Sequence, residues 1–107
     1  MFKLLKIGAD WCNNCNILNV QLKLLNIKYI DINIDNIDDI KEDFINNYTE
    51  EIYNLILKTD KLPTIYILDN NKLIKTMIGY NINRLDELKN LLIEYKFLLN
   101  LDYNEEF

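Results

Sequence analysis

The chain has 107 residues, half of them hydrophobic, and a formal net charge of −5. This length suits one domain and is short for two, so we expect a single domain over residues 1–107, with 100–107 as a loose C-terminal tail. The net negative charge argues against a groove for nucleic acid, which relies on clustered Lys and Arg, but it leaves room for a small basic patch. Its apolar runs are too short to span a membrane or to form a secretory signal, so the expected location is cytoplasmic.

The first predicted element is a short buried strand over Leu4–Ile7, which ends at Gly8. From Asn13 onward, apolar residues recur at helical spacing and predict a helix of about three turns. Residues 29–34 alternate between apolar and polar side chains, which is typical of a strand. The helical face consists of Ile17, Leu18, Leu22 and Leu25.

Residues 37–59 are predicted to be helical in two pieces, after Asp35 and Asn36 as capping residues. Asn47 or Thr49 caps the second piece, whose first turn is acidic. The apolar faces are Ile37, Ile40, Phe44 and Ile45 in the first piece and Ile52, Leu55 and Ile56 in the second.

The C-terminal part predicts a strand over 64–68, a turn at 69–71 and a returning strand over 73–78 that stops at Gly79. A last helix begins near Asn83. Because crossover helices connect parallel strands, the first two strands should run parallel and the last two should form a hairpin. The expected fold is therefore α/β, with a four-stranded mixed sheet and helices on both faces.

The two cysteines of the chain lie in the run Asp10-Trp11-Cys12-Asn13-Asn14-Cys15, at the predicted start of a helix. Unpaired backbone N–H groups and the helix macrodipole favour negative charge there. They lower the pKa of a thiol and raise its thiolate fraction. Cys15 follows one turn later, close enough to attack a mixed disulfide on Cys12. The pattern thus indicates thiol–disulfide exchange, with Cys12 as the nucleophile and Cys15 as a more buried resolving thiol.

Two other interpretations of this cysteine pair stay open on the sequence alone. A zinc site generally needs four Cys or His ligands, and the chain has no His and no further Cys, so carboxylates or a second copy would have to complete it. The pair could also be two core cysteines, since Cys is often buried. The polar Asn13 and Asn14 and the adjacent Trp11 argue against that. We therefore expect no metal site.

The ordered combination of these motifs resembles the thioredoxin family. Trp-Cys-Asn-Asn-Cys after a short strand, Leu62-Pro63-Thr64 before a hairpin and Gly79 before a last helix carry the likeness, over roughly residues 3–98. The resemblance implies a thioredoxin-like fold and protein-disulfide reduction through a redox-active disulfide between Cys12 and Cys15, without a bound cofactor.

The resemblance also implies roles for the residues around the cysteines. Trp11 would border the docking surface, and Gly79 would line it. Pro63 would be preceded by a cis peptide bond and face the cysteines, which leaves the backbone of Leu62 free to pair with a substrate strand. From the residues alone, each of these is also an ordinary feature: a core aromatic, a turn glycine and a proline that starts a strand.

The sequence departs from thioredoxins in several places. The cysteines follow the first predicted strand of the sequence, as in glutaredoxins, whereas thioredoxins have an extra strand and helix before the active-site strand. Asn13 and Asn14 replace the usual Gly-Pro between the cysteines. Their side chains can offer hydrogen bonds near the sulfurs, which predicts a less reducing potential than that of a typical thioredoxin. Lys6 replaces a buried carboxylate; a strand lysine is expected to point to solvent, although it could instead stabilise a thiolate.

The expected partners are disulfide-containing protein substrates and an electron donor, either a flavin-dependent thioredoxin reductase or glutathione. Glutathione recognition has less support, since Lys61-Leu62-Pro63 and Tyr80-Asn81 replace the usual glutaredoxin motifs. For the extra helical segment, residues 49–58, the sequence leaves two roles open: it influences the choice of partner, or it only packs against the rest of the domain. The alternatives are a glutathione-dependent glutaredoxin-like enzyme and a non-catalytic binding module with the same fold.

Overall fold

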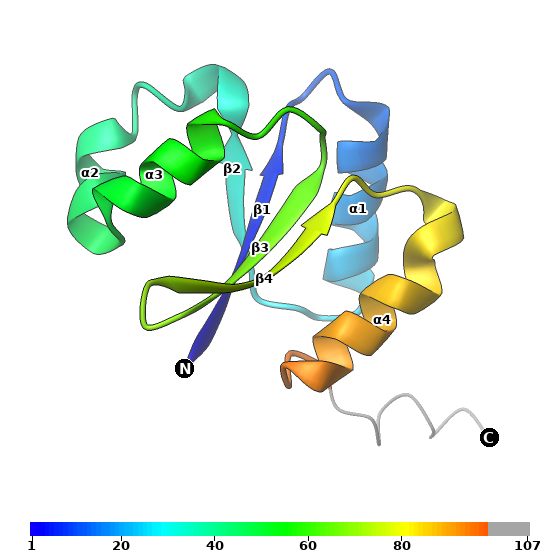
Figure 1. Cartoon of the computed structure of the whole chain (residues 1–107). Coiled ribbons are helices and arrows are strands. Elements are labelled where there is room, and N and C mark those ends of the chain that lie inside the picture. Colours follow the sequence, from blue (N-terminus) through cyan, green and yellow to red (C-terminus); the bar gives the residue numbers. More distant parts are fainter. Residues whose placement is uncertain (99–107) are drawn as a thin grey trace.

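The computed structural model of the chain describes residues 1–98, and the expected loose tail, 100–107, lies outside the described residues. A four-stranded sheet in the order β2-β1-β3-β4 forms its centre (Figure 1). The strands are β1 (Phe2–Gly8), β2 (Ile30–Asn33), β3 (Thr64–Asp69) and β4 (Lys72–Ile78).

The sheet is mixed, as predicted. β1 and β2 run parallel, because helix α1 (Asn13–Leu24) crosses over between them. β3 runs antiparallel to β1 and forms a hairpin with β4. The turn of this hairpin places Asn70 and Asn71 at φ 51° and 66°, a conformation that asparagine tolerates better than most residues.

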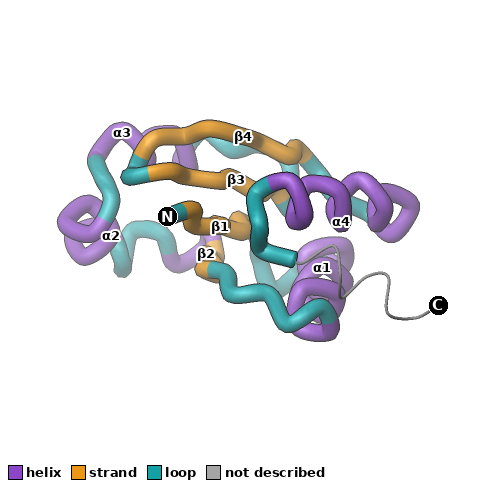
Figure 2. Tube along the Cα trace, turned by 90° about the horizontal axis from the view of Figure 1, so that it is seen from below, coloured by secondary structure: helices purple, strands orange, loops and turns teal. Residues whose placement is uncertain are grey.

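Helices cover both faces of the sheet (Figure 2). α1 and α4 (Leu85–Glu94) lie on one side of the strands, and α2 (Lys41–Asn47) and α3 (Glu50–Leu57) lie on the other. Successive strand residues point to opposite faces, so Leu4 and Leu5 belong to separate buried cores. The first core contains Leu18, Leu22 and Leu88; the second contains Phe44, Ile52 and Ile56.

The region between β2 and β3 differs in detail from the prediction. Asp35 and Asn36 do not cap a helix but lie in a 3₁₀ turn (Ile34–Asn36), and the Asn33 side chain accepts the N–H of Asp35 at 2.9 Å. α2 begins only at Lys41. Ile37 is nevertheless buried, because the preceding turns carry it into the second core.

The cap predicted for α3 is confirmed. Thr49 Oγ1 accepts the N–H of Ile52 at 3.1 Å, and Glu50 and Glu51 follow in the first turn. The last helix is preceded by a 3₁₀ turn (Ile82–Arg84), which Asn81 caps.

No helix within residues 1–98 is both long enough and apolar enough to cross a membrane.

The strand register determines which loops meet at one end of the sheet. Ile7 pairs with Thr64, and Thr64 pairs with Ile78. The residues just beyond these positions are therefore neighbours at the same end: Gly8 on β1, Pro63 before β3 and Gly79 after β4. In Figure 1 the N-terminal end of α1 lies at this end too.

Candidate active site

A disulfide joins Cys12 and Cys15, whose Cα atoms are 5.2 Å apart, at the start of α1. Cys12 is the N-cap residue, and its Sγ accepts the backbone N–H of Cys15 at 3.2 Å. The first turn of α1 contains no acidic residue. The backbone and the helix dipole therefore favour negative charge at this sulfur.

The two sulfurs differ in their access to solvent. Cys12 is partly exposed, whereas Cys15 is fully buried, with no exposed surface. The difference follows from the geometry of the helix start, because the N-cap residue stands outside the first turn and the third helical residue turns toward the sheet. Only Cys12 can meet an external disulfide without a rearrangement.

Trp11 lies beside this sulfur on the surface rather than in a core. Trp11 is 71% exposed, and its Nε1 donates a hydrogen bond to Asp35 Oδ2 at 2.9 Å. Asp35 comes from the 3₁₀ turn after β2, and for this residue the sequence predicts only a helix cap. The hydrogen bond fixes the orientation of a large exposed ring next to Cys12.

Asn13 and Asn14 are both exposed. The donor that the structure gives to Cys12 Sγ is the backbone of Cys15, not an asparagine side chain. A direct influence of these two side chains on the sulfurs stays a prediction.

Pro63 is buried and follows a cis peptide bond, so the conformation that the resemblance implied is confirmed. Leu62 is partly exposed, and the pairing of β3 starts two residues later, at Thr64. Thr64 Oγ1 donates to the carbonyl of Lys61 at 2.6 Å and closes the turn before the strand. The backbone of Leu62 therefore lies outside the β ladder at the active-site end of the sheet.

Gly79 adopts φ +68°, in the left-handed region that favours glycine, and a Cβ there would meet no atom within 4 Å. Its carbonyl accepts a hydrogen bond from Arg84 Nη1, which also donates to the carbonyl of Ile78 at 2.6 Å. Glu87 accepts hydrogen bonds from the same guanidinium, and these bonds, together with the charge of Arg84, lower the pKa of the Glu87 carboxyl. Arg84 thus fixes the turn at Gly79, a contact that no sequence motif indicated.

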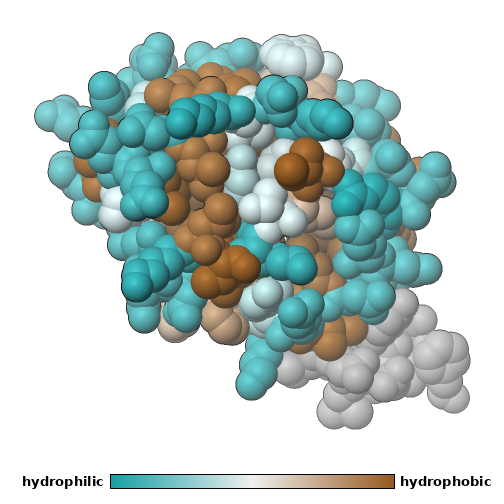
Figure 3. Space-filling view, in the orientation of Figure 1, coloured by the Kyte–Doolittle hydropathy of each residue, from teal (hydrophilic) through white to brown (hydrophobic). Residues whose placement is uncertain are grey.

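Exposed apolar side chains continue from this turn. Ile78 and Ile82, on the two sides of this turn, are 57% and 49% exposed. Leu73 and Ile74 are also exposed, but they lie toward the other end of the edge strand β4. Figure 3 shows hydrophobic side chains on this face of the molecule, bordered by hydrophilic ones. The exposed apolar side chains at this turn lie at the same end of the sheet as the disulfide, and such surface suits contact with another polypeptide.

The expectation that Lys6 points to solvent is wrong. Lys6 is only 2% exposed, and its Nζ forms an ion pair with Asp31 Oδ1 at 3.0 Å. On β1 its side chain alternates with those of Leu5 and Ile7, so it points toward the face that α1 covers. The lysine therefore lies behind the cysteines instead of on the surface.

Gly8 is adjacent to both Lys6 and Cys15, and a side chain at this position would contact both of them closely. A Cβ at Gly8 would lie 3.0 Å from Lys6 Cε, 3.0 Å from Cys15 Sγ and 3.1 Å from Cys15 Cβ. These are closer than ordinary van der Waals contacts, so a neighbour would have to move. Close packing at this point therefore favours glycine over a residue with a side chain.

Gly8→Ala is expected to destabilise the oxidised protein by about 1 to 2 kcal/mol. The added methyl group would lie too close to Cys15, whose side chain is held in place by the disulfide. Urea unfolding of the oxidised wild type and variant measures the difference. Unchanged or increased stability would show that the site can accommodate a Cβ.

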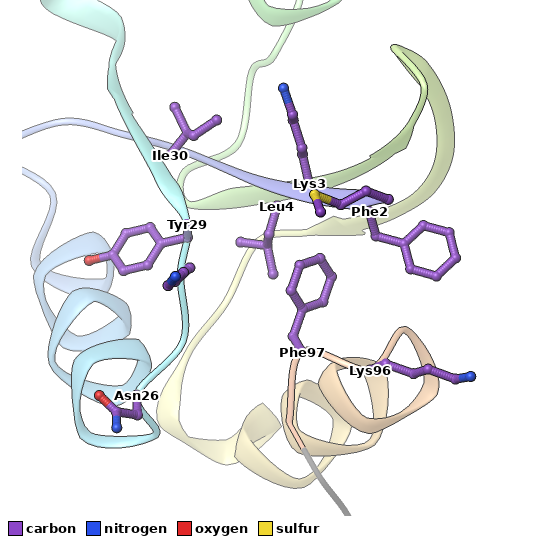
Figure 4. Close-up of a pocket in the computed structure, with 10 residues that line it drawn as sticks. Phe2, Lys3, Leu4, Asn26, Tyr29, Ile30, Lys96 and Phe97 are labelled. Carbon is purple, nitrogen blue, oxygen red and sulfur yellow. The ribbon is translucent and has the colours of Figure 1, made fainter.

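A pocket of about 510 Å³ lies at the opposite end of β1 from the disulfide. Figure 4 shows Leu4 and Phe97 pointing toward one another in it, with Tyr29 and Asn26 on the side of α1. Since it opens beside the start of β1, it takes no part in the cysteine site. Within residues 1–98, no three His, Cys, Asp or Glu side chains gather closely enough to hold a metal ion.

No family model matches the sequence, and no curated protein matches it significantly. The structure, however, is similar to solved thioredoxins. Oxidised thioredoxin from Plasmodium falciparum superposes with a TM-score of 0.62 at 18% identity, over 88% of this chain and 80% of that one. A thioredoxin variant from Halobacterium salinarum gives 0.60 at 19% identity, over 92% and 77%.

Thioredoxin f2 from Chlamydomonas reinhardtii gives a TM-score of 0.58 at 18% identity, over 88% of this chain and 78% of that one. Identities this low establish the architecture and nothing finer. Together with the sheet order and the cysteine pair at the start of α1, they confirm the expected fold. The chain is a protein of the thioredoxin fold.

Proposed function

We propose that the chain is a thiol–disulfide oxidoreductase that reduces protein disulfides by dithiol exchange through Cys12 and Cys15. One observation carries this proposal: a partly exposed sulfur caps a helix and is bonded to a buried sulfur one turn behind it. The fold alone would not suffice, because the same fold can carry unrelated functions.

The reaction starts from the dithiol form. The Cys12 thiolate attacks one sulfur of the substrate disulfide, forms a mixed disulfide with it and releases the other substrate sulfur as a thiolate that takes up a proton. The Cys15 thiol loses its proton and attacks Cys12 Sγ, so the Cys12–Cys15 bond forms and the mixed disulfide breaks. The substrate leaves with two thiols, and its two-electron reduction equals the oxidation of the pair.

The surface around Cys12 suits an extended polypeptide. The exposed Trp11 ring lies on one side, and the apolar Ile78 and Ile82 extend from the turn at Gly79. The backbone of Leu62, outside the ladder, can pair with a substrate strand. These groups would hold a disulfide-containing segment against the exposed sulfur.

The catalytic cycle needs a donor that returns the pair to its dithiol form. We propose a flavin-dependent reductase of the thioredoxin type as this donor, with glutathione as the alternative. In either case the protein supplies the two cysteines and the donor supplies the electrons, without a cofactor bound to the chain.

The test is reduction of insulin by dithiothreitol, followed as precipitation of the freed B chain. The wild type is expected to accelerate precipitation in proportion to its concentration, and a Cys12→Ser/Cys15→Ser double variant is expected to give the rate of dithiothreitol alone. If the folded wild type also gives only that rate, the proposal fails, and a non-catalytic binding module becomes the better interpretation.

A further inference from the structure

Lys6 and Asp31 form an ion pair of unequal exposure. They are direct neighbours in the parallel register of β1 and β2, with Nζ and Oδ1 3.0 Å apart. The lysine side chain is 3% exposed, whereas the aspartate side chain is 49% exposed. The cation is therefore deep in the protein, and the carboxylate that balances it is near solvent.

The buried end of this pair approaches the buried sulfur. Lys6 Cε and Cys15 Sγ each lie 3.0 Å from the point that a Gly8 Cβ would occupy. The two atoms can thus be no further apart than twice that distance, and the ammonium nitrogen is one bond beyond Cε. Gly8, which has no side chain, leaves this space free of intervening atoms.

Burial of a lysine is costly unless its charge has partners. Asp31 supplies one of them, but its half-exposed carboxylate is partly screened by water. Cys15 has no exposed surface, so a charge on its sulfur cannot be stabilised by bulk solvent. In such surroundings a nearby cation interacts with that charge much more strongly than it would in water.

We propose that the ammonium of Lys6 stabilises negative charge on the sulfur of Cys15. This inference rests on the proposed function, which it deepens: it assigns Lys6 as a positioning residue that governs how easily the Cys12–Cys15 bond opens.

The step concerned is reduction of the protein's own disulfide. A thiolate of dithiothreitol attacks Cys12 Sγ and forms a mixed disulfide, and the bond between Cys12 and Cys15 breaks. The electron pair of that bond leaves with Cys15 as a thiolate, which then takes up a proton. The second dithiothreitol sulfur closes its own ring and frees Cys12. Stabilisation of the departing Cys15 thiolate accelerates the first of these steps.

Other charges near the pair act more weakly on Cys15. The N-terminal end of α1 lies closer to Cys12, whose sulfur accepts the Cys15 N–H. Asp35 is exposed and holds the Trp11 ring, and Asp10 is exposed at the preceding turn. Lys6 is the buried cation on the strand directly behind the sulfur, and Asp31 is the anion that opposes it.

The test compares Lys6→Met, which keeps the length of the side chain but removes the charge, with Asp31→Asn, which keeps a hydrogen-bond acceptor for Nζ but removes the opposing carboxylate. The readout is the second-order rate constant for reduction of the Cys12–Cys15 disulfide by dithiothreitol at fixed pH. Lys6→Met is expected to lower it by roughly fivefold, and Asp31→Asn is expected to raise it.

If Lys6 had a purely structural role, both variants should change the rate constant in the same direction, because both substitutions break the same ion pair. Rate constants that change in the same direction in the two variants, or that change by less than about twofold in both, would overturn the proposal. If Lys6→Met does not fold, Lys6→Gln replaces it with the same expectation. Lys6→Arg, which keeps the charge, should stay near the wild-type rate.

A second measurement isolates the buried sulfur. In a Cys12→Ser background, the ultraviolet absorbance of the thiolate at one mildly alkaline pH reports the ionised fraction of Cys15. Lys6→Met is expected to lower the ratio of thiolate to thiol by roughly tenfold; an unchanged ratio counts against the proposal. Neither measurement needs a protein substrate, so a failure here is distinguishable from a failure in the insulin assay.

Discussion

Cys12→Ser is expected to reduce the protein-dependent rate of insulin reduction to background, a loss of about a thousandfold or more. A serine hydroxyl stays protonated at neutral pH and does not attack disulfides, so the helix N-terminus has no thiolate to stabilise. The substitution removes one sulfur from a partly exposed position. It should leave the two cores intact, because Cys12 belongs to neither of them.

The matched control separates loss of chemistry from loss of structure. Reduced wild type and Cys12→Ser should unfold in urea at similar concentrations, since the disulfide is absent from both. If Cys12→Ser retained more than a few per cent of the activity, the nucleophile would be Cys15 or another group, and the assignment built on exposure would be wrong.

Cys15→Ser is expected to stop the reaction at its midpoint and accumulate a mixed disulfide between Cys12 and the substrate. The first attack needs only the exposed sulfur, whereas release needs the buried sulfur one turn behind it. Incubation of the reduced variant with insulin should give a covalent complex on non-reducing gels and in intact mass spectra. Dithiothreitol should cleave this complex by reducing the mixed disulfide, and the wild type should form almost no complex.

The same variant distinguishes the possible donors. If glutathione restores turnover in Cys15→Ser by attacking the mixed disulfide, the monothiol glutathione route is supported over a reductase. A variant that forms no complex, although it folds and its thiol alkylates normally, would contradict Cys12 as the attacking sulfur. When the variant does form complexes, proteins that it captures from cell extract are candidate substrates only if their capture requires Cys12.

Most of the architecture followed from local patterns in the sequence. The alternating pattern at β2, the short apolar runs of β1 and β3, the helical face of α1 and the cap at Thr49 each agree with the structure. Burial of one face imposes a matching period on apolar residues, whereas a strand that is buried on both faces has a continuous apolar run. The apolar spacing predicts helix from residue 37, whereas α2 begins at Lys41. Ile37 is buried from a turn, and apolar spacing cannot tell a buried turn residue from the face of a helix.

The positions of the two sulfurs at the start of α1 were also predictable from the sequence, since the spacing of the cysteines places them one helical turn apart. The supporting contacts were not. Trp11 bonds to Asp35, and Arg84 to the carbonyls at Gly79, because the sheet brings distant segments to one end. Such pairings depend on strand register, for which a single sequence carries little signal.

What the sequence by itself determined is the order of the elements, the mixed sheet and the cysteine pair at the start of α1, all of which follow from spacing along the chain. What only the tertiary structure decided is the surroundings of that pair, and Lys6 shows why. On a strand, a lysine is expected in water unless a partner can balance its charge. That partner is Asp31, which the parallel pairing of β1 and β2 places directly beside it. Burial of the cation behind Cys15 is therefore a consequence of the register, not of the residue.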